Sequence, residues 1–243
     1  MLKKQKLKII AVMPAFNAEK TIEKTYRDIP KDTVNKIILV DDGSKDNTVK
    51  IAKKLGFEVI THPQNRGYGA NQKTCYTIAL SEGADIIIMI HPDYQYDSTL
   101  APELIRPIIQ GRFDIMLGSR IRTRREALSG NMPRYKYVGN RFLTFIENLV
   151  LGQNLSEYHT GFRAYTKETL KKIPFHKYSD DFVFDQQILF GAIAQGARIG
   201  ETPVPVRYFP EASSINLKHS IIYGLSILRD LLIYSLLGKK HFS

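Results

Sequence analysis

The stretch Ile86–Asp97, IIIMIHPDYQYD, decides the fold of this chain. It opens with five consecutive apolar residues, a short β-branched run that is typical of a strand buried on both faces in a parallel sheet. Pro92 cannot donate a hydrogen bond to a neighbouring strand, so we expect the strand to end there. Asp93 and Gln95 follow at its carboxyl end, which is where open α/β sheets bind their ligands.

Asp93 and Gln95 allow two interpretations. A carboxylate and an amide can hold a hard divalent cation through oxygen atoms, with a phosphate completing the coordination shell. Alternatively, Asp93 caps the helix that follows, which is a common use of aspartate. Asp97 is predicted to be structural. The stretch by itself leaves both interpretations open.

Apolar runs and helical segments alternate through the first half of the chain. We expect strands at Lys8–Met13, Lys36–Val40, Phe57–Thr61 and Asp85–Ile90, and helices at about Asn17–Asp28, Thr48–Leu55 and Ala70–Glu82. Asn17 is the expected N-cap of the first helix, and Pro14 is expected to stop the first strand. This spacing predicts an α/β fold with a doubly wound, mostly parallel sheet flanked by helices.

The second half of the chain is less regular. It is predicted to contain a helix at Ser98–Gln110, a strand at Phe113–Gly118, a basic loop at Ser119–Arg134, and helices at Arg141–Leu151, Lys167–Ile173 and Asp181–Gln195. A strand is expected after Glu157 and another at Ile199–Val206. Leu217–Leu237 has the broad apolar face of an amphipathic helix. Since no linker separates two domains, we expect one domain over residues 1–216 and a C-terminal amphipathic helix within 217–243 that is not a separate domain.

Composition excludes several classes of protein. The chain has 243 residues, of which 43% are hydrophobic, enough for a full core. Its single cysteine, Cys75, favours a reducing compartment, so we expect a cytoplasmic protein. The first apolar stretch breaks at Pro14, too soon for a signal peptide. The longest apolar candidate, Ile221–Leu237, contains an arginine and an aspartate, so we expect no transmembrane helix.

The net charge of +11 is concentrated in two places. Lysines cluster before the first strand, and residues 119–141 carry seven Lys and Arg residues against one Glu. Such clusters suit an anionic partner: nucleic acid, an anionic membrane surface or a phosphorylated substrate. The basic run lacks the interleaved aromatic residues on which bases stack, so we do not expect a nucleic-acid partner.

Two motifs at strand ends are candidates for binding a nucleotide. Asp41 and Asp42 end the second strand and precede a glycine, so a carboxylate there could accept hydrogen bonds from a base or a ribose, or serve only the turn. Gly67 belongs to a loop, Asn65–Asn71, whose glycines precede a helix and could let backbone amides approach a phosphate. This loop matches neither known phosphate-binding glycine pattern, so an ordinary loop is favoured there.

Cations and buried acids complete the set of candidates. Arg120 ends a predicted strand at the same sheet edge, while Arg163 and Arg207 come from later segments, and a diphosphate or phosphate needs such cations. Asp181 and Asp185 lie four residues apart and therefore on one face of an apolar helix. Asp181 could cap that helix, so Asp185 is the clearer candidate for a buried functional acid.

Together these motifs resemble family 2 glycosyltransferases, most closely the dolichyl-phosphate mannose synthase branch. The resemblance spans Lys8 to about Asn216 and rests on motifs in the family's order: Pro14-Ala15-Phe16-Asn17, Val40-Asp41-Asp42-Gly43-Ser44, Asn65-Arg66-Gly67, Asp93-Tyr94-Gln95, Gly118-Ser119-Arg120 and Gly161-Phe162-Arg163-Ala164. It implies the GT-A fold, a UDP- or GDP-sugar donor, a divalent metal (Mn²⁺ or Mg²⁺) and inversion at the anomeric carbon.

The resemblance also assigns roles to individual residues. The nucleotide would be surrounded by Pro14, Phe16, Asn17 and Glu19, with Asp41 and Asp42 at the base or ribose. Asp93 and Gln95 would bind the metal, and Arg120 and Arg207 would face the phosphates. Two positions depart from the family's pattern. His91 stands where the family has an aspartate, two residues before Asp93. The acid usually found four residues before Gly161 is Glu157 here, a conservative replacement. Histidine can bind Mn²⁺ but suits Mg²⁺ poorly, so His91 either joins the shell or leaves it one ligand short.

The acceptor determines which groups catalysis needs. A hydroxyl acceptor would need Asp185 or Asp181 as a base, whereas a lipid phosphate is already an anion at neutral pH. The phosphate would instead need cations, which residues 119–141 and Lys218 could supply. With the amphipathic C-terminal helix, this charge favours a peripheral enzyme at the inner face of a membrane that uses a polyprenyl phosphate. The same helix could instead pack on the core or on a second copy of the chain, and a non-catalytic scaffold that binds the nucleotide sugar also remains open.

Overall fold

The computed structural model describes residues 7–121, 123, 125, 132–207, 217–238 and 241–242. Within these residues, seven strands form one sheet: β1 Ile9–Ala15, β2 Lys36–Asp41, β3 Glu58–Thr61, β4 Ile86–Met89, β5 Ile115–Ser119, β6 Arg163–Thr166 and β7 Ile199–Pro203. Their order is β3-β2-β1-β4-β6-β5-β7, and only β6 runs antiparallel to its neighbours. The predicted mostly parallel sheet is confirmed.

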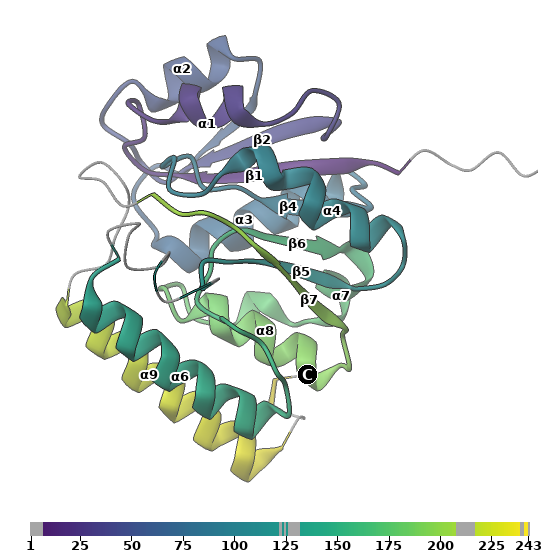
Figure 1. The fold of residues 1–243 in the computed structure, drawn as a ribbon. Helices are drawn as coiled ribbons and strands as arrows, with labels where there is room; N and C mark the ends of the chain where they lie inside the picture. The colour runs from purple at the N-terminus through teal and green to yellow at the C-terminus, as the bar shows by residue number, and fades with distance from the viewer. Residues whose placement is uncertain are drawn as a thin grey trace, which may run out of the picture.

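Helices cover both faces of this sheet (Figure 1). They are α1 Ile22–Asp28, α2 Thr48–Lys54, α3 Tyr68–Ser81, α4 Ala101–Ile109, α6 Arg134–Leu151, α7 Lys167–Lys172, α8 Phe184–Ala194 and α9 Leu217–Leu237, with short 3-10 turns η1 at Ser98–Leu100 and η2 at Phe175–Lys177. Alternate residues of β1 point to opposite faces. Ile10 and Val12 join the core beneath α3 and α8, and Ala11 and Met13 join the core beneath α1 and α4.

Pro14 does not stop β1 as expected. The strand continues to Ala15, and Pro14 lies opposite Val40 of β2. On the other side of β1, the pairing with β4 ends at Val12 and Met89. Pro14 therefore lies beyond the end of one neighbouring strand, where a missing N–H breaks no ladder hydrogen bond.

Three helices begin at other residues than the sequence predicts. Asn17 is not an N-cap: its φ is +51°, its Oδ1 accepts a hydrogen bond from the Lys45 backbone N at 3.0 Å, and α1 begins at Ile22. The helix expected from Asp181 begins at Phe184. The helix expected from Arg141 begins at Arg134, so part of the basic run lies on α6 instead of in a loop.

The two longest helices, α6 and α9, lie side by side at one end of the sheet (Figure 1). Ile227, Leu231 and Tyr234 of α9 are buried in the core that α8 also lines. By length and composition alone, Lys218–Leu237 is long and apolar enough to cross a membrane, in contrast to the expectation that the chain has no such helix. One side of α9 is nevertheless packed against the protein.

Candidate active site

The loops that follow β1 and β2 are joined by hydrogen bonds from the predicted donor-binding residues. The Asn17 backbone N donates to Ser44 Oγ at 2.8 Å, and Asn47 donates through its backbone and its side chain to Glu19 Oε2 at 2.9 and 3.0 Å. Phe16 at the tip of the first loop is 52% exposed, so its ring is available to pack against a flat base. These hydrogen bonds thus hold the two loops together as one preformed edge.

Asp41 and Asp42 are both buried below these loops. Asp42 Oδ1 lies 2.7 Å from His62 Nδ1 and accepts from the Arg66 backbone N at 2.9 Å, while its Oδ2 accepts from the Gly67 backbone N at 3.0 Å. A carboxylate has about four acceptor sites, so capacity for a ligand donor remains. Asp41 Oδ1 is buried and has no hydrogen-bond partner among the described residues, a cost that a ligand's donor group would remove.

Gly67 is required by a close contact between two backbones. Its φ is +104°, and a Cβ there would lie 2.6 Å from the backbone O of Asp180. The same residue donates its N–H to Asp42. The sequence favoured an ordinary loop here over one that approaches a phosphate, and the structure shows that this glycine joins the loop to the segment before α8.

We expect Gly67→Ala to destabilise the fold by about 2 kcal/mol more than Gly56→Ala. Both glycines have positive φ, so both substitutions meet backbone strain. Gly56 has open space where the Cβ would be, whereas Gly67 has a carbonyl oxygen. Urea unfolding of the two variants measures the difference. Equal losses would show that the contact with Asp180 is not tight.

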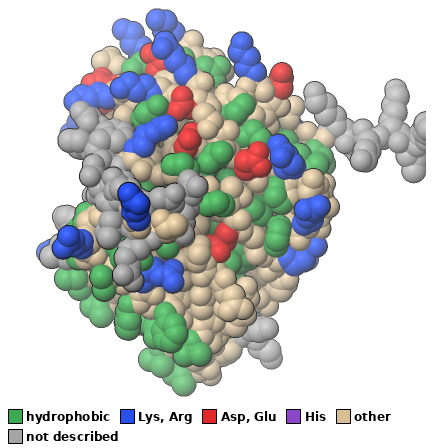
Figure 2. Space-filling model, viewed as in Figure 1, with side chains coloured by type: hydrophobic (Ala, Val, Ile, Leu, Met, Phe, Trp, Pro, Cys, Tyr) green, Lys and Arg blue, Asp and Glu red, His purple; other side chains and the backbone are tan. Residues whose placement is uncertain are grey.

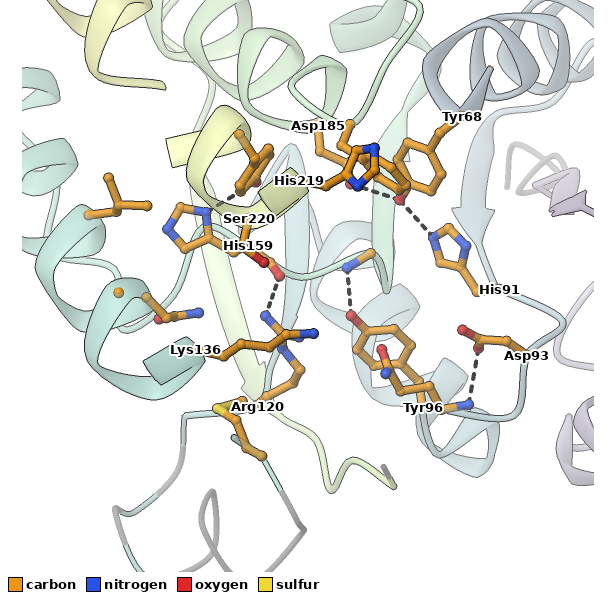
Figure 3. Close-up of a pocket in the computed structure, with 18 of the residues that line it drawn as sticks. Tyr68, His91, Asp93, Tyr96, Arg120, Lys136, His159, Asp185, His219 and Ser220 are labelled. Atoms are coloured by element: carbon orange, nitrogen blue, oxygen red, sulfur yellow. Dashed lines mark hydrogen bonds between the residues drawn. The ribbon is translucent and has the colours of Figure 1, made fainter. Parts of the chain in front are cut away.

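A cavity of about 590 Å³ lies beside the carboxyl end of β4 (Figure 3). Its wall includes His91, Asp93 and Gln95 from the loop after β4, together with Arg120 and Asp185. Side chains from α6 and from the first turns of α9 close its other side. The structure therefore brings five of the predicted site residues to one cavity.

The predicted metal ligands are adjacent but form only part of a coordination shell. Asp93 and Gln95 are both buried, and the Gln95 backbone N donates to Asp93 Oδ1 at 3.0 Å. Within the described residues no group of three His, Cys, Asp or Glu side chains is placed to hold an ion. One carboxylate and one amide oxygen fit Mg²⁺ or Mn²⁺ only if a ligand's phosphates and water supply the remaining oxygen atoms.

His91 is engaged with Tyr68 of α3. The two rings are parallel within 5°, with centroids 5.7 Å apart, and His91 Nε2 lies 3.3 Å from the Tyr68 hydroxyl. Tyr68 in turn donates to Asp185 Oδ2 at 2.8 Å, and its own pKa is raised by burial and by the charge of Asp185. The histidine that replaces the expected aspartate is therefore connected to the acid at the start of α8 (Figure 3).

Asp185 is a buried carboxylate that faces the cavity and is held by three side chains. Besides Tyr68, Gln72 donates to Oδ1 at 2.9 Å, and Arg163 Nη1 lies 3.8 Å from the same oxygen. Asp181 differs: it is exposed, its Oδ1 accepts from the Phe182 backbone N at 2.7 Å, and it is not part of the cavity wall. Of the two predicted acids, only Asp185 is placed to meet a substrate in the cavity.

Arg163 is not placed to contact a phosphate, contrary to the sequence-based expectation. It is 1% exposed, and its guanidinium donates to the backbone O atoms of Thr160, Asp185 and Tyr158 at 2.5, 2.5 and 2.9 Å. These bonds use the five-donor fork of arginine to fix the loop before β6. Arg163 supports the cavity from behind and reaches no ligand in it.

Arg120 does line the cavity, where it forms a buried ion pair with Glu157. Its Nε donates to Glu157 Oε1 at 2.8 Å, its backbone N donates to Oε2 at 2.6 Å, and Asn140 of α6 adds a bond at 2.8 Å. Burial alone would raise the pKa of Glu157, but the charge and hydrogen bonds of Arg120 outweigh it and the pKa is lowered. Arg120 is thereby held in one orientation at the cavity wall.

Lys136 of α6 is a cavity residue that the sequence indicated only as one charge in a basic run. Its pKa is lowered by burial and by the nearby charge of Arg120. Two neighbouring cations in a partly buried cavity repel each other, so an anion between them would be stabilised. His159, His219 and Tyr68 also line this cavity. Tyr68 lies in the Asn65–Asn71 loop, but no role was predicted from the sequence for any of these three side chains.

Arg207 and Lys218 lie outside the cavity wall. The Arg207 guanidinium packs 4.5 Å from the Tyr94 ring centroid and 3.7 Å from Asp28, while its backbone N donates to the Gln95 O at 2.9 Å. Lys218 is exposed in the first turn of α9, immediately before His219 and Ser220 of the cavity. Both residues flank the site: Arg207 packs on the loop that carries Asp93 and Gln95, and Lys218 directly precedes the cavity residues of α9.

Comparison with known proteins identifies the family. Residues 10–174 match the model of glycosyl transferase family 2. The chain is 31% identical to a UDP-N-acetylglucosamine–dolichyl-phosphate N-acetylglucosaminyltransferase of Methanococcus voltae, over 91% of this chain and 96% of that protein. It is 27% identical to a dolichyl-phosphate hexose transferase of Haloferax volcanii, over 82% of each.

A solved structure shares the fold. Glucosyl-3-phosphoglycerate synthase from Mycobacterium tuberculosis, in complex with Mn²⁺, UDP and glucosyl-3-phosphoglycerate, superposes with a TM-score of 0.69 at 18% identity, covering 96% of this chain and 81% of that one. In this fold, Asp41, Asp42 and Asp93 lie at the carboxyl ends of β2 and β4, and Arg120 follows β5 at the cavity wall. On the extent of the sequence match, the chain belongs to glycosyl transferase family 2.

Proposed function

We propose that this protein transfers a sugar from a nucleoside diphosphate sugar to the phosphate of a polyprenyl lipid, with inversion at the anomeric carbon. The main observation in support of this proposal is that Arg120 and Lys136 are close together in a cavity that Asp93 and Gln95 also line. Relatives named for dolichyl-phosphate acceptors support the same substrate class. In the reaction, the bond from the anomeric carbon to the diphosphate breaks and a bond to an acceptor phosphate oxygen forms.

The donor would bind along the edge formed by the loops after β1 and β2. Phe16 would pack against the base, and the unpartnered oxygen of Asp41 would accept a hydrogen bond from base or ribose, with Asp42 beside it. Asp93 and Gln95 would hold a divalent cation, which supplies Lewis-acid stabilisation of the leaving diphosphate. Arg207 lies at the same loop and adds positive charge near those phosphates.

The acceptor would bind in the cavity with its phosphate between Arg120 and Lys136. The second pKa of a phosphate monoester is about 6, so its oxygen is already a nucleophile at neutral pH and no side chain has to remove a proton. The two cations hold this anion near the donor, and the anion in turn favours the charged form of Lys136. Because the acceptor carries a lipid chain, we infer that the enzyme works at the cytoplasmic face of a membrane.

We expect UDP- or GDP-sugars to raise the melting temperature of the protein in the presence of Mn²⁺, because a ligand at 100 times its Kd stabilises the native state by about 2.7 kcal/mol. Asp42→Ala and Asp93→Ala should reduce this shift. Transfer should then occur to a polyprenyl phosphate and not to the matching polyprenol, with the KM for the phosphate raised about tenfold or more in Lys136→Gln. No stabilisation by any common nucleotide sugar would contradict the proposal.

A saccharide hydroxyl is a second candidate acceptor, since Asp185 faces the cavity as a carboxylate held by Tyr68 and Gln72. Such an acceptor would need Asp185 as its base, so Asp185→Asn would abolish turnover. With a phosphate acceptor, the same variant should keep most of its turnover. Binding of the nucleotide sugar without turnover on either acceptor would instead indicate a scaffold.

A further inference from the structure

The outer faces of α6 and α9 carry a continuous set of exposed large apolar side chains. Figure 2 shows hydrophobic side chains gathered over the end of the molecule where these two helices lie. The exposed residues are Val138, Phe142, Phe145 and Leu149 on α6 and Ile221, Ile222, Leu225, Leu232, Leu236 and Leu237 on α9, with exposed fractions between 48% and 73%. Apolar patches of this extent on a protein surface mark an interaction site.

The charges on the same two helices are cationic wherever they reach the surface. Arg134, Arg141 and Lys218 are exposed, and Arg229 has an exposed side chain. Each helix has one acidic residue, Glu147 on α6 and Asp230 on α9, and these are 0% and 2% exposed. The outer surface of Arg134–Leu151 and Lys218–Leu237 thus presents apolar and positively charged groups and no exposed carboxylate.

The inner face of α9 fixes the helix to the protein. Tyr234 packs edge to face on Phe190 of α8 with centroids 6.2 Å apart, and Gln187 of α8 donates to the buried Asp230 at 2.7 Å. To cross a membrane, α9 would have to break these contacts and expose Asp230 to hydrocarbon, at a cost of several kcal/mol. The helix is therefore suited to lie along a membrane surface with α6 beside it.

We propose that α6 and α9 together form a docking surface for an anionic lipid bilayer, with their apolar residues in the interface and their cations at the phosphate headgroups. The charge complements anionic lipid, whereas a second copy of the chain would bring like charges together. The cavity continues this surface, since Tyr135 and Leu143 of α6 and His219 and Tyr223 of α9 line it. The inference rests on the proposed lipid-phosphate acceptor, whose chain would then enter the cavity from the bilayer.

Vesicle flotation of the full chain tests this surface. Wild-type protein should float with phosphatidylcholine vesicles that contain about 30% phosphatidylglycerol, and less with phosphatidylcholine alone or at high salt. Phe145→Ser, Leu149→Ser, Leu225→Ser and Leu236→Ser together should reduce the partition coefficient at least tenfold. Ile109→Ser, at an exposed apolar residue of α4, should leave it unchanged. Circular dichroism verifies that the variants stay folded.

Three outcomes would overturn the proposal: equal flotation of the fourfold variant, no flotation of wild type, or a wild-type dimer that the fourfold variant loses while vesicles are ignored. The last would assign the surface to a second copy of the chain. Thermal shift with nucleotide sugars and transfer to a short, water-soluble polyprenyl phosphate should be unchanged in the fourfold variant. If wild type floats but transfers nothing, the proposed function fails and the docking surface stands.

Discussion

Replacing Asp93 by asparagine should lower the turnover of sugar transfer by about 10²–10³-fold, because the substitution removes the one carboxylate of the predicted metal shell and with it much of the stabilisation of the leaving diphosphate. The fold should be unaffected, since asparagine has the same shape and can still accept the hydrogen bond from the Gln95 backbone N. Steady-state kinetics at saturating Mn²⁺ and donor measures the effect.

The matched control is Asp97→Asn, four residues further along the same loop. Asp97 caps η1 by accepting from the Thr99 backbone N at 3.1 Å and from its Oγ1 at 2.6 Å. Asparagine caps helices about as well as aspartate, so turnover should stay within about twofold of wild type. Comparable losses in both variants would mean that Asp93 serves the loop's conformation and is no metal ligand.

Replacing Glu157 by alanine should lower the free energy of unfolding by about 3 kcal/mol, because it leaves the largely buried Arg120 side chain without its counter-charge. Glu157 is 0% exposed and accepts from Arg120 and Asn140, so it joins the end of β5 to α6. A loss of this size corresponds to a melting temperature lower by about 10 °C in a chain of this length. Transfer activity should fall as well, since Arg120 would lose its fixed orientation.

Glu103→Ala provides the comparison, since it breaks a surface pair with Arg106 and should cost about 0.5 kcal/mol or less. The pKa of Glu157 is lowered from its ordinary value of 4.5, so its contribution to stability is present above pH 4.5 and is lost as the pH falls through the lowered pKa. Glu157→Gln should therefore lose less stability on acidification below pH 4.5 than wild type. Unfolding curves at pH 3 and pH 7 that change equally in both proteins would contradict this.

The sequence predicted the sheet because its information is local. Ile86–Ile90 and Lys36–Val40 are mainly apolar runs long enough for a buried strand and too short for a helix. The spacing between successive predicted strands, such as Lys36–Val40 and Phe57–Thr61, fits one crossover. Residues directly after such strands must share an edge of the sheet, so strand order along the chain suffices to place Asp42 and Asp93 on the same edge. Segment ends were less well predicted at Pro14 and Asn17, because their neighbours in space determine them.

Only the tertiary structure decided what each candidate side chain contacts. Asp185 and Asp181 share one face of the predicted helix. Tyr68 and Gln72, more than a hundred residues earlier in the chain, hold Asp185 at the cavity, whereas Asp181 is exposed. Arg163 and Arg120 carry the same charge and could both have served a ligand's phosphates. Arg163, however, is buried behind Asp185 and does not line the cavity. Periodicity and strand ends are properties of neighbouring residues, which the sequence determines by itself. Burial and charge pairing arise between segments distant in the chain, and only their packing fixes them.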